Sequence, residues 1–187
     1  MKKIFKQTAL SLAAFILFSS TIQAQEKTVM VGGAEMYPSK NIVENAINSK
    51  DHTTLVAAVK AAGLVETLQS DGPFTVFAPT NEAFNKLPAG TVETLVKPEN
   101  KEKLTKILTY HVIAGKIDSK MLMDLIKKNN GTYTAKTVEG DELKFMMKGK
   151  SLIVADANGN TAMVTIKDVY QKNGVIHVID SVLLPKS

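Results

Sequence analysis

The chain has 187 residues, with 23 basic side chains against 18 acidic ones and a formal net charge of +5. Every basic residue is lysine, and the sequence contains no arginine, tryptophan or cysteine. Because bidentate recognition of guanine and phosphate relies on arginine, this composition argues against nucleic-acid binding. The lack of cysteine excludes a thiol nucleophile, a cysteine-based metal site and disulfides, so an apolar core must hold the fold together.

The N-terminus has the layout of a secretory signal peptide over residues 1–24. Three lysines precede an apolar run at residues 9–18, and Ala24 ends a polar segment that follows it. Ten apolar residues are too few to span a bilayer, which takes about 20. We therefore expect a secreted protein, in the periplasm or outside the cell at its surface, without a membrane span after signal removal. Loss of three of the 23 lysines leaves 20 against 18 acids, a net charge of +2.

Residues 25–38 contain Gly32-Gly33 and are expected to form a flexible N-terminal lead, followed by one domain over residues 39–187. Its first half has the apolar spacing of helices. A left-handed Gly63 is expected to end the second of them. In the helix that Asp118-Ser119 caps, we expect Met121, Leu122, Leu125 and Ile126 to face inward. The predicted helices cover residues 38–47, 53–62, 64–69, 81–87, 91–96, 98–111 and 119–128, the first of them opening at Pro38-Ser39.

The stretch from Phe74 to Phe84 combines a strand and a helix. Phe74 to Ala78 is a short apolar run between Gly72-Pro73 and Pro79, which is typical of a buried strand. Thr80 is a good N-cap, so a helix can begin at the next residue. The last third of the chain alternates apolar and polar residues with strand period. Strands are predicted at residues 143–147, 151–155, 162–166 and 175–179, the last of them central. Helices first and strands last indicate an α+β fold.

The residues that might carry chemistry favour structural roles. The three histidines, His52, His111 and His177, lack the spacing of a metal site. In an unbroken strand His177 and Asp180 would point to opposite faces, which disfavours a Ser-His-Asp triad. The segment after Asp156 resembles a calcium loop only briefly and is better explained as a hairpin turn. We expect no catalytic residue, metal or cofactor.

Three segments together resemble the fasciclin domain family. They are residues 75–81, the pair Tyr110-His111, and residues 174–185, with the resemblance extending over about residues 41–185. The resemblance implies a twisted β-wedge or sandwich with N-terminal and flanking helices. It also implies an extracellular role in adhesion without catalytic residues. In animal members a tyrosine-histidine pair and an Asp-Ile stretch are linked to integrin binding, which implies binding roles for Tyr110, His111 and Asp168. Here Val169 replaces the isoleucine.

Two functions remain open from the sequence. The first is a non-enzymatic, secreted adhesion protein that contacts a cell-surface or matrix protein or glycan. The alternative is a periplasmic or extracellular module that binds a small molecule, lipid or glycan, because the methionine-containing interior offers adaptable apolar surface. For His111, the spacing on an apolar helix stripe favours a core residue bonded to the backbone over a binding residue.

Overall fold

Seven strands form one twisted sheet in the computed structural model, which describes residues 27–186. Their spatial order is β4-β3-β9-β8-β7-β6-β5. β3 and β9 run parallel, and the other neighbouring pairs are antiparallel. The strands are β3 (Phe74–Pro79), β4 (Val112–Ala114), β5 (Thr132–Lys136), β6 (Glu142–Lys148), β7 (Ser151–Ala155), β8 (Thr161–Gln171) and β9 (Gly174–Ile179).

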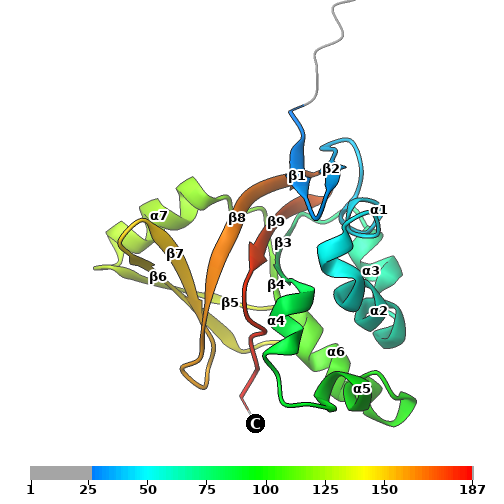
Figure 1. Ribbon diagram of the computed structural model, residues 1–187. Coiled ribbons are helices and arrows are strands. Elements are labelled where there is room, and N and C mark those ends of the chain that lie inside the picture. Colours follow the sequence, from blue (N-terminus) through cyan, green and yellow to red (C-terminus); the bar gives the residue numbers. More distant parts are fainter. Residues whose placement is uncertain (1–26, 187) are drawn as a thin grey trace, which may run out of the picture.

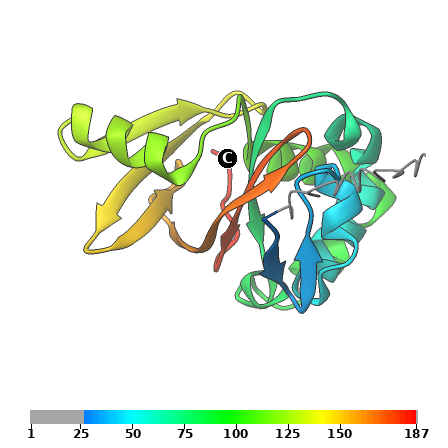
Figure 2. The same cartoon turned by 90° about the horizontal axis from the view of Figure 1, so that it is seen from above.

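The helices lie at opposite ends of this sheet. Helices α1 to α6 gather over β3, β4 and β9, whereas α7 packs on β5 and β6 (Figures 1 and 2). This arrangement confirms the predicted α+β wedge. The α-helices are α1 (Ile42–Ala46), α2 (Thr53–Ala62), α3 (Val65–Gln69), α4 (Asn81–Asn85), α5 (Thr91–Leu95), α6 (Lys101–Tyr110) and α7 (Ser119–Lys128); short 3₁₀ turns occupy Lys50–His52 and Pro98–Asn100.

The N-terminal region differs from the flexible lead expected at residues 25–38. Within it, β1 (Val29–Val31) and β2 (Ala34–Met36) form an antiparallel hairpin. The side chains of Val31 and Met36 are buried against the end of the sheet and α1. The hairpin is ordered because two apolar side chains lose contact with water there. The predicted signal peptide, residues 1–24, lies outside the described residues.

Side-chain caps fix where several helices begin. Thr80 accepts a hydrogen bond from the Ala83 N–H at 3.2 Å, as its position after Pro79 predicts. Asn41 forms a capping box with Glu44, so α1 begins after Asn41 and not at the predicted Pro38-Ser39. These bonds satisfy N–H groups that have no partner inside the helix.

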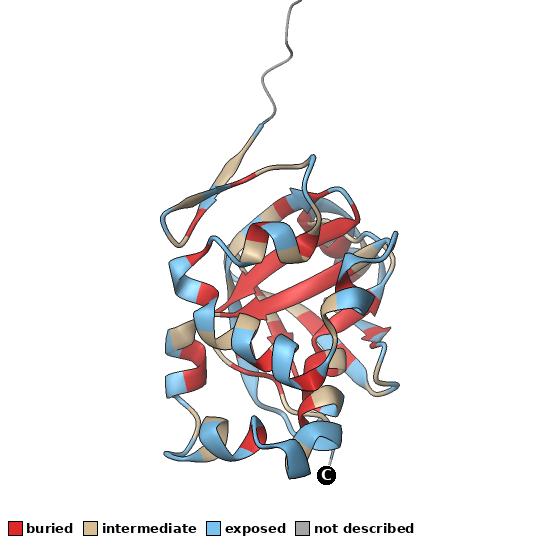
Figure 3. Cartoon of the chain, turned by 90° about the vertical axis from the view of Figure 1, so that its right-hand side faces the viewer, coloured by how far each residue is buried: buried red, intermediate tan, exposed pale blue. Residues whose placement is uncertain are grey.

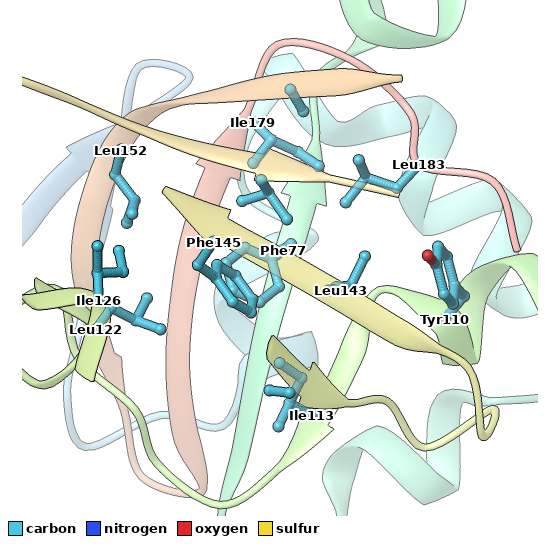
Figure 4. Packing of buried hydrophobic residues seen from close by; sticks show 13 residues of the cluster. Phe77, Tyr110, Ile113, Leu122, Ile126, Leu143, Phe145, Leu152, Ile179 and Leu183 are labelled. Atoms are coloured by element: carbon cyan, nitrogen blue, oxygen red, sulfur yellow. The ribbon is translucent and has the colours of Figure 1, made fainter. Parts of the chain in front are cut away.

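The two central strands are buried on both faces. Every residue of β9 is buried, which confirms its predicted central position. In β3, Phe77 packs into one cluster with Tyr110 and Phe145 (Figure 4). Val76 packs into a second cluster, which also contains residues of α1 to α3. Figure 3 shows these buried strands behind a layer of partly exposed helices. The apolar run that begins at Phe74 is therefore explained by burial on both sides of the sheet.

The prediction that Met121 of α7 faces inward is wrong. Met121 is 48% exposed, whereas its neighbour Leu122 is fully buried. Met121 precedes Leu122 by one residue, so its side chain is turned by about 100° around the helix from that of Leu122. Of the predicted stripe, Leu122 and Ile126 are buried in the core.

Candidate functional site

Tyr110, the last residue of α6, lies inside the core. Its side chain is fully buried, and its hydroxyl donates to the Glu142 carbonyl at 2.9 Å. The same oxygen accepts a hydrogen bond from the Ala157 N–H at 2.9 Å. Burial, together with the charges of Asp156, Asp141 and Glu139, raises the pKa of Tyr110 to about 12. The hydroxyl therefore ties α6 to β6 and to the turn between β7 and β8.

His111 is the C-cap of α6 and is equally enclosed. Its Nδ1 donates to the Ile107 carbonyl at 2.8 Å, and its Nε2 accepts from the Leu183 N–H at 3.0 Å. The helix carbonyl and the C-terminal segment thus select one neutral tautomer. Burial lowers the pKa of His111 to about 4. Sequence reasoning anticipated a backbone-bonded core histidine, and the structure has this arrangement.

The pair of residues therefore offers no side-chain surface to a partner in this conformation. Tyr110 and His111 are 0% and 3% exposed, and the polar atoms of both side chains are bonded to the main chain. Their adjacent rings pack edge to face, with 6.5 Å between the ring centroids. The arrangement connects α6 to strands and to the C-terminal segment that are far away in the sequence.

Asp168 lies at an irregular point of β8, apart from the Tyr110-His111 pair. Its backbone has a φ of +60°, where the register between β8 and β9 shifts. Its carboxylate accepts a hydrogen bond from the Ser119 N–H at 2.7 Å and one from the Ser119 hydroxyl at 2.5 Å. These bonds bring the bulge of β8 to the N-terminus of α7, where a negative charge is also favoured by the helix dipole.

His177 also contacts the segment where the bulge of β8 meets the start of α7. Its Nε2 donates to the Ile117 carbonyl at 2.9 Å, and its Nδ1 accepts from the Asp168 N–H at 3.3 Å. Its ring stacks on that of Phe77, with 5.5 Å between the ring centroids. Burial lowers the pKa of His177. Asp180 instead accepts from the Met163 N–H, so it does not orient His177. The structural role predicted for His177 is confirmed.

Several exposed side chains lie near the contact between Asp168 and the start of α7. Tyr170 is 37% exposed, and its ring lies 4.8 Å from the Lys116 ammonium. The Tyr170 hydroxyl approaches the Asp118 carboxylate at 3.4 Å, and that carboxylate also caps α7 by accepting from the Met121 N–H. Met121 is itself 48% exposed. We call Lys116, Asp118, Met121 and Tyr170 the α7–β8 face. No sequence pattern predicted that these residues lie near one another.

A second feature that sequence reasoning missed is an apolar cavity between α2 and the sheet. It has a volume of about 90 Å³ and is partly open to solvent. Its walls include Leu55 and Val59 of α2, Val76 of β3 and Ile176 of β9, and the N-terminal hairpin closes one end. His52, which is 3% exposed, also lines it. The predicted apolar stripe of α2 was the signal that pointed to this surface.

The described residues form neither a metal site nor a membrane-spanning helix. Over residues 27–186, no group of three or more histidine, aspartate or glutamate side chains has the arrangement of a metal site. The Asp156 carboxylate accepts hydrogen bonds from the Asn158 and Asn160 N–H groups, as in a hairpin turn. None of the helices in this part of the chain is long and apolar enough to cross a bilayer.

The fold is that of a FAS1 domain. A solved FAS1 domain pair from the insect cell adhesion molecule fasciclin I matches with a TM-score of 0.69 and 18% identity, over 79% of this chain and 52% of that chain. The chain belongs to the fasciclin domain family, whose model matches residues 50–185. It is 48% identical over 164 residues to protein sll1483 from Synechocystis sp., covering 88% of this chain and 84% of the relative. Immunogenic protein MPB70 from Mycobacterium bovis is 39% identical over 145 residues, 75% of this chain and 66% of that protein.

Proposed function

We propose that the chain is a non-enzymatic, secreted adhesion protein that acts at the cell surface or matrix through protein–protein contacts. Membership of the fasciclin domain family carries the proposal, together with the similarity in fold to a cell adhesion molecule. The side chains of Tyr110, His111 and His177 support it, because each is bonded to the main chain and buried. A catalytic acid or base would instead need access to a substrate.

The α7–β8 face is the contact surface that we assign to this function. It presents an exposed aromatic ring, a cation and a methionine on a rigid base. Tyrosine and methionine are enriched in the centres of protein interfaces, and an aromatic ring loses little conformational entropy on binding. In this proposal Asp168 acts by holding α7 against β8, and Tyr110 and His111 act by holding α6. All three residues would then affect adhesion through the shape of the domain.

Deletion and surface variants test the proposal directly. Deleting the gene should reduce attachment of the cells to a surface and their biofilm, and unchanged attachment would count strongly against adhesion. The double substitution Met121→Ala with Tyr170→Ala should reduce attachment at normal protein levels. Met30→Ala is the matched control, because Met30 is a methionine that is 58% exposed on the N-terminal hairpin and does not belong to the α7–β8 face.

A second candidate function is a periplasmic or extracellular module that binds a small molecule, lipid or glycan. The observation that favours it is the apolar cavity beneath α2. Binding sites for small molecules are commonly concave and mostly apolar, with few polar groups. A ligand that binds only the folded state raises its melting temperature, so a thermal-shift screen against lipids and glycans tests this candidate.

A further inference from the structure

The cavity wall contains one polar atom without a regular hydrogen-bond partner. Among the buried side-chain polar atoms of residues 27–186, His52 Nε2 alone lacks such a partner. The nearby Ala78 main chain offsets part of the lowering of the His52 pKa by burial, but it makes no bond of regular geometry with this nitrogen. A buried polar group left unpaired is costly, so an acceptor atom placed here by a ligand would be favourable.

The state of His52 indicates which ligand atom it would bind. Ser49 Oγ lies 2.8 Å from His52 Nδ1, and both residues are buried. The Ser49 hydroxyl makes no other hydrogen bond with the described residues, so it donates to Nδ1, which leaves the imidazole hydrogen on Nε2. Burial keeps the ring neutral by lowering its pKa. His52 therefore presents one N–H donor in a buried place, where an uncharged oxygen acceptor costs less desolvation than a charged one.

Helix α2, which begins directly after His52, places a positive charge farther along the cavity. Lys60 lines it, is exposed, and forms no salt bridge with the part of the chain that the structure describes. A lysine in this position buries its aliphatic stem and keeps its ammonium in water. Eight residues separate Lys60 from His52, which is about 12 Å along a helix. Leu55, Val56 and Val59 line the wall between them.

We propose that this cavity binds a medium-chain aliphatic carboxylate. The aliphatic chain of the ligand lies along Leu55 and Val59, and its carboxylate pairs with Lys60. Where the ligand also carries an oxygen at the opposite end of the chain, that oxygen accepts a hydrogen bond from His52. The cavity volume of about 90 Å³ holds part of the chain, and the rest follows the open side. This inference rests on the second candidate function and is independent of adhesion.

Calorimetric titration of the full-length, delipidated protein tests the ligand class. Decanoate should bind, and decanol should bind about two- to fivefold more weakly, the range expected for an exposed ion pair. The compound ω-hydroxydecanoate should bind roughly two- to tenfold more tightly than decanoate, because its hydroxyl reaches His52. High salt should narrow the difference between decanoate and decanol, because the ion pair is exposed.

Two variants test whether the ligand binds in this cavity, and a third variant serves as a control. Lys60→Gln should abolish the preference for decanoate over decanol, and Lys103→Gln, an exposed lysine on α6, should retain it. Val59→Phe should fill the cavity and reduce affinity for every ligand at least tenfold, with the fold checked by circular dichroism. Because Val59→Phe risks overpacking, Lys60→Gln provides an independent test on a surface residue.

The failures of the two proposals are distinguishable. Absence of binding by both acids, or decanoate binding that both Lys60→Gln and a folded Val59→Phe leave unchanged, would overturn the carboxylate site. Equal affinity for decanoate and ω-hydroxydecanoate would overturn the role of His52. If the acids do not bind but another lipid or glycan raises the melting temperature, the ligand class is wrong and the second candidate function stands. If no compound of the panel binds or raises the melting temperature, both the carboxylate site and the second candidate function are refuted.

Discussion

Replacing His111 with alanine should destabilise the domain measurably at neutral pH. The imidazole accepts from the Leu183 N–H at 3.0 Å and donates to the Ile107 carbonyl at 2.8 Å. His111→Ala leaves the buried Leu183 N–H without a partner, which costs about 1–3 kcal/mol, and the cavity left by the ring adds to this cost. That is a large share of the roughly 5–15 kcal/mol by which folded domains are stable.

The same substitution should change how stability depends on pH. The pKa of His111 is about 4 in the folded protein, against an ordinary value of 6.5. The unfolded chain therefore takes up a proton first as the pH falls. The stabilisation by neutral His111 is present above the ordinary pKa, is lost progressively between pH 6.5 and about 4, and amounts to about 3 kcal/mol. His111→Ala lacks this contribution, so wild type and variant should converge in acid.

Urea denaturation at several pH values between about 4 and about 7.5 measures both effects. Lys103→Ala, an exposed change on the same helix, is the control and should stay within about 0.5 kcal/mol of wild type. Equal urea midpoints for wild type and His111→Ala at neutral pH would refute the assigned hydrogen bonds. A difference that does not shrink in acid would refute the neutral, buried imidazole.

Four further substitutions test other parts of the structure. Tyr110→Phe should cost about 1–3 kcal/mol in urea denaturation, because it removes both hydrogen bonds of the hydroxyl, to the Glu142 carbonyl and the Ala157 N–H, without changing the ring; an unchanged midpoint would contradict those contacts. Gly174→Ala should prevent normal folding, since its Cβ would lie 2.1 Å from a main-chain carbonyl oxygen of β3, and a native circular dichroism spectrum would disprove this. Leu122→Ala should cost about 2–5 kcal/mol, whereas Met121→Ala should change stability by less than about 0.5 kcal/mol; similar losses for both would contradict their difference in exposure.

Local chemistry was enough to predict much of this fold. The apolar run at Phe74, the stop at Pro79 and the cap at Thr80 depend on residues that are adjacent in sequence, and the structure contains the strand and helix that they predict. Gly63 ends α2 in the left-handed conformation, with a φ of +74°. The burial of His111 also followed from helix spacing, because the residue continues the apolar stripe of α6.

The N-terminal hairpin could not be predicted in the same way. Its strands are three residues each and gain stability only by covering apolar surface elsewhere. Asn45 shows the same dependence, because its buried amide donates to the Tyr37 carbonyl and to Gln171, which follows it by 126 residues. Short strands and buried amides have little preference of their own, so long-range contacts decide their structure.

The sequence by itself determined the fold family, the helices and the strands β3 and β6 to β9, and the residues around which a site would be sought, but it did not predict β1, β2, β4 or β5. Tertiary structure alone decided what those residues touch. It placed Tyr110 and His111 inside the core, set Asp168 beside the start of α7, and opened a cavity at His52. The physical reason is that propensity and periodicity act over a few residues, whereas burial, hydrogen-bond partners and cavities arise where distant segments pack together.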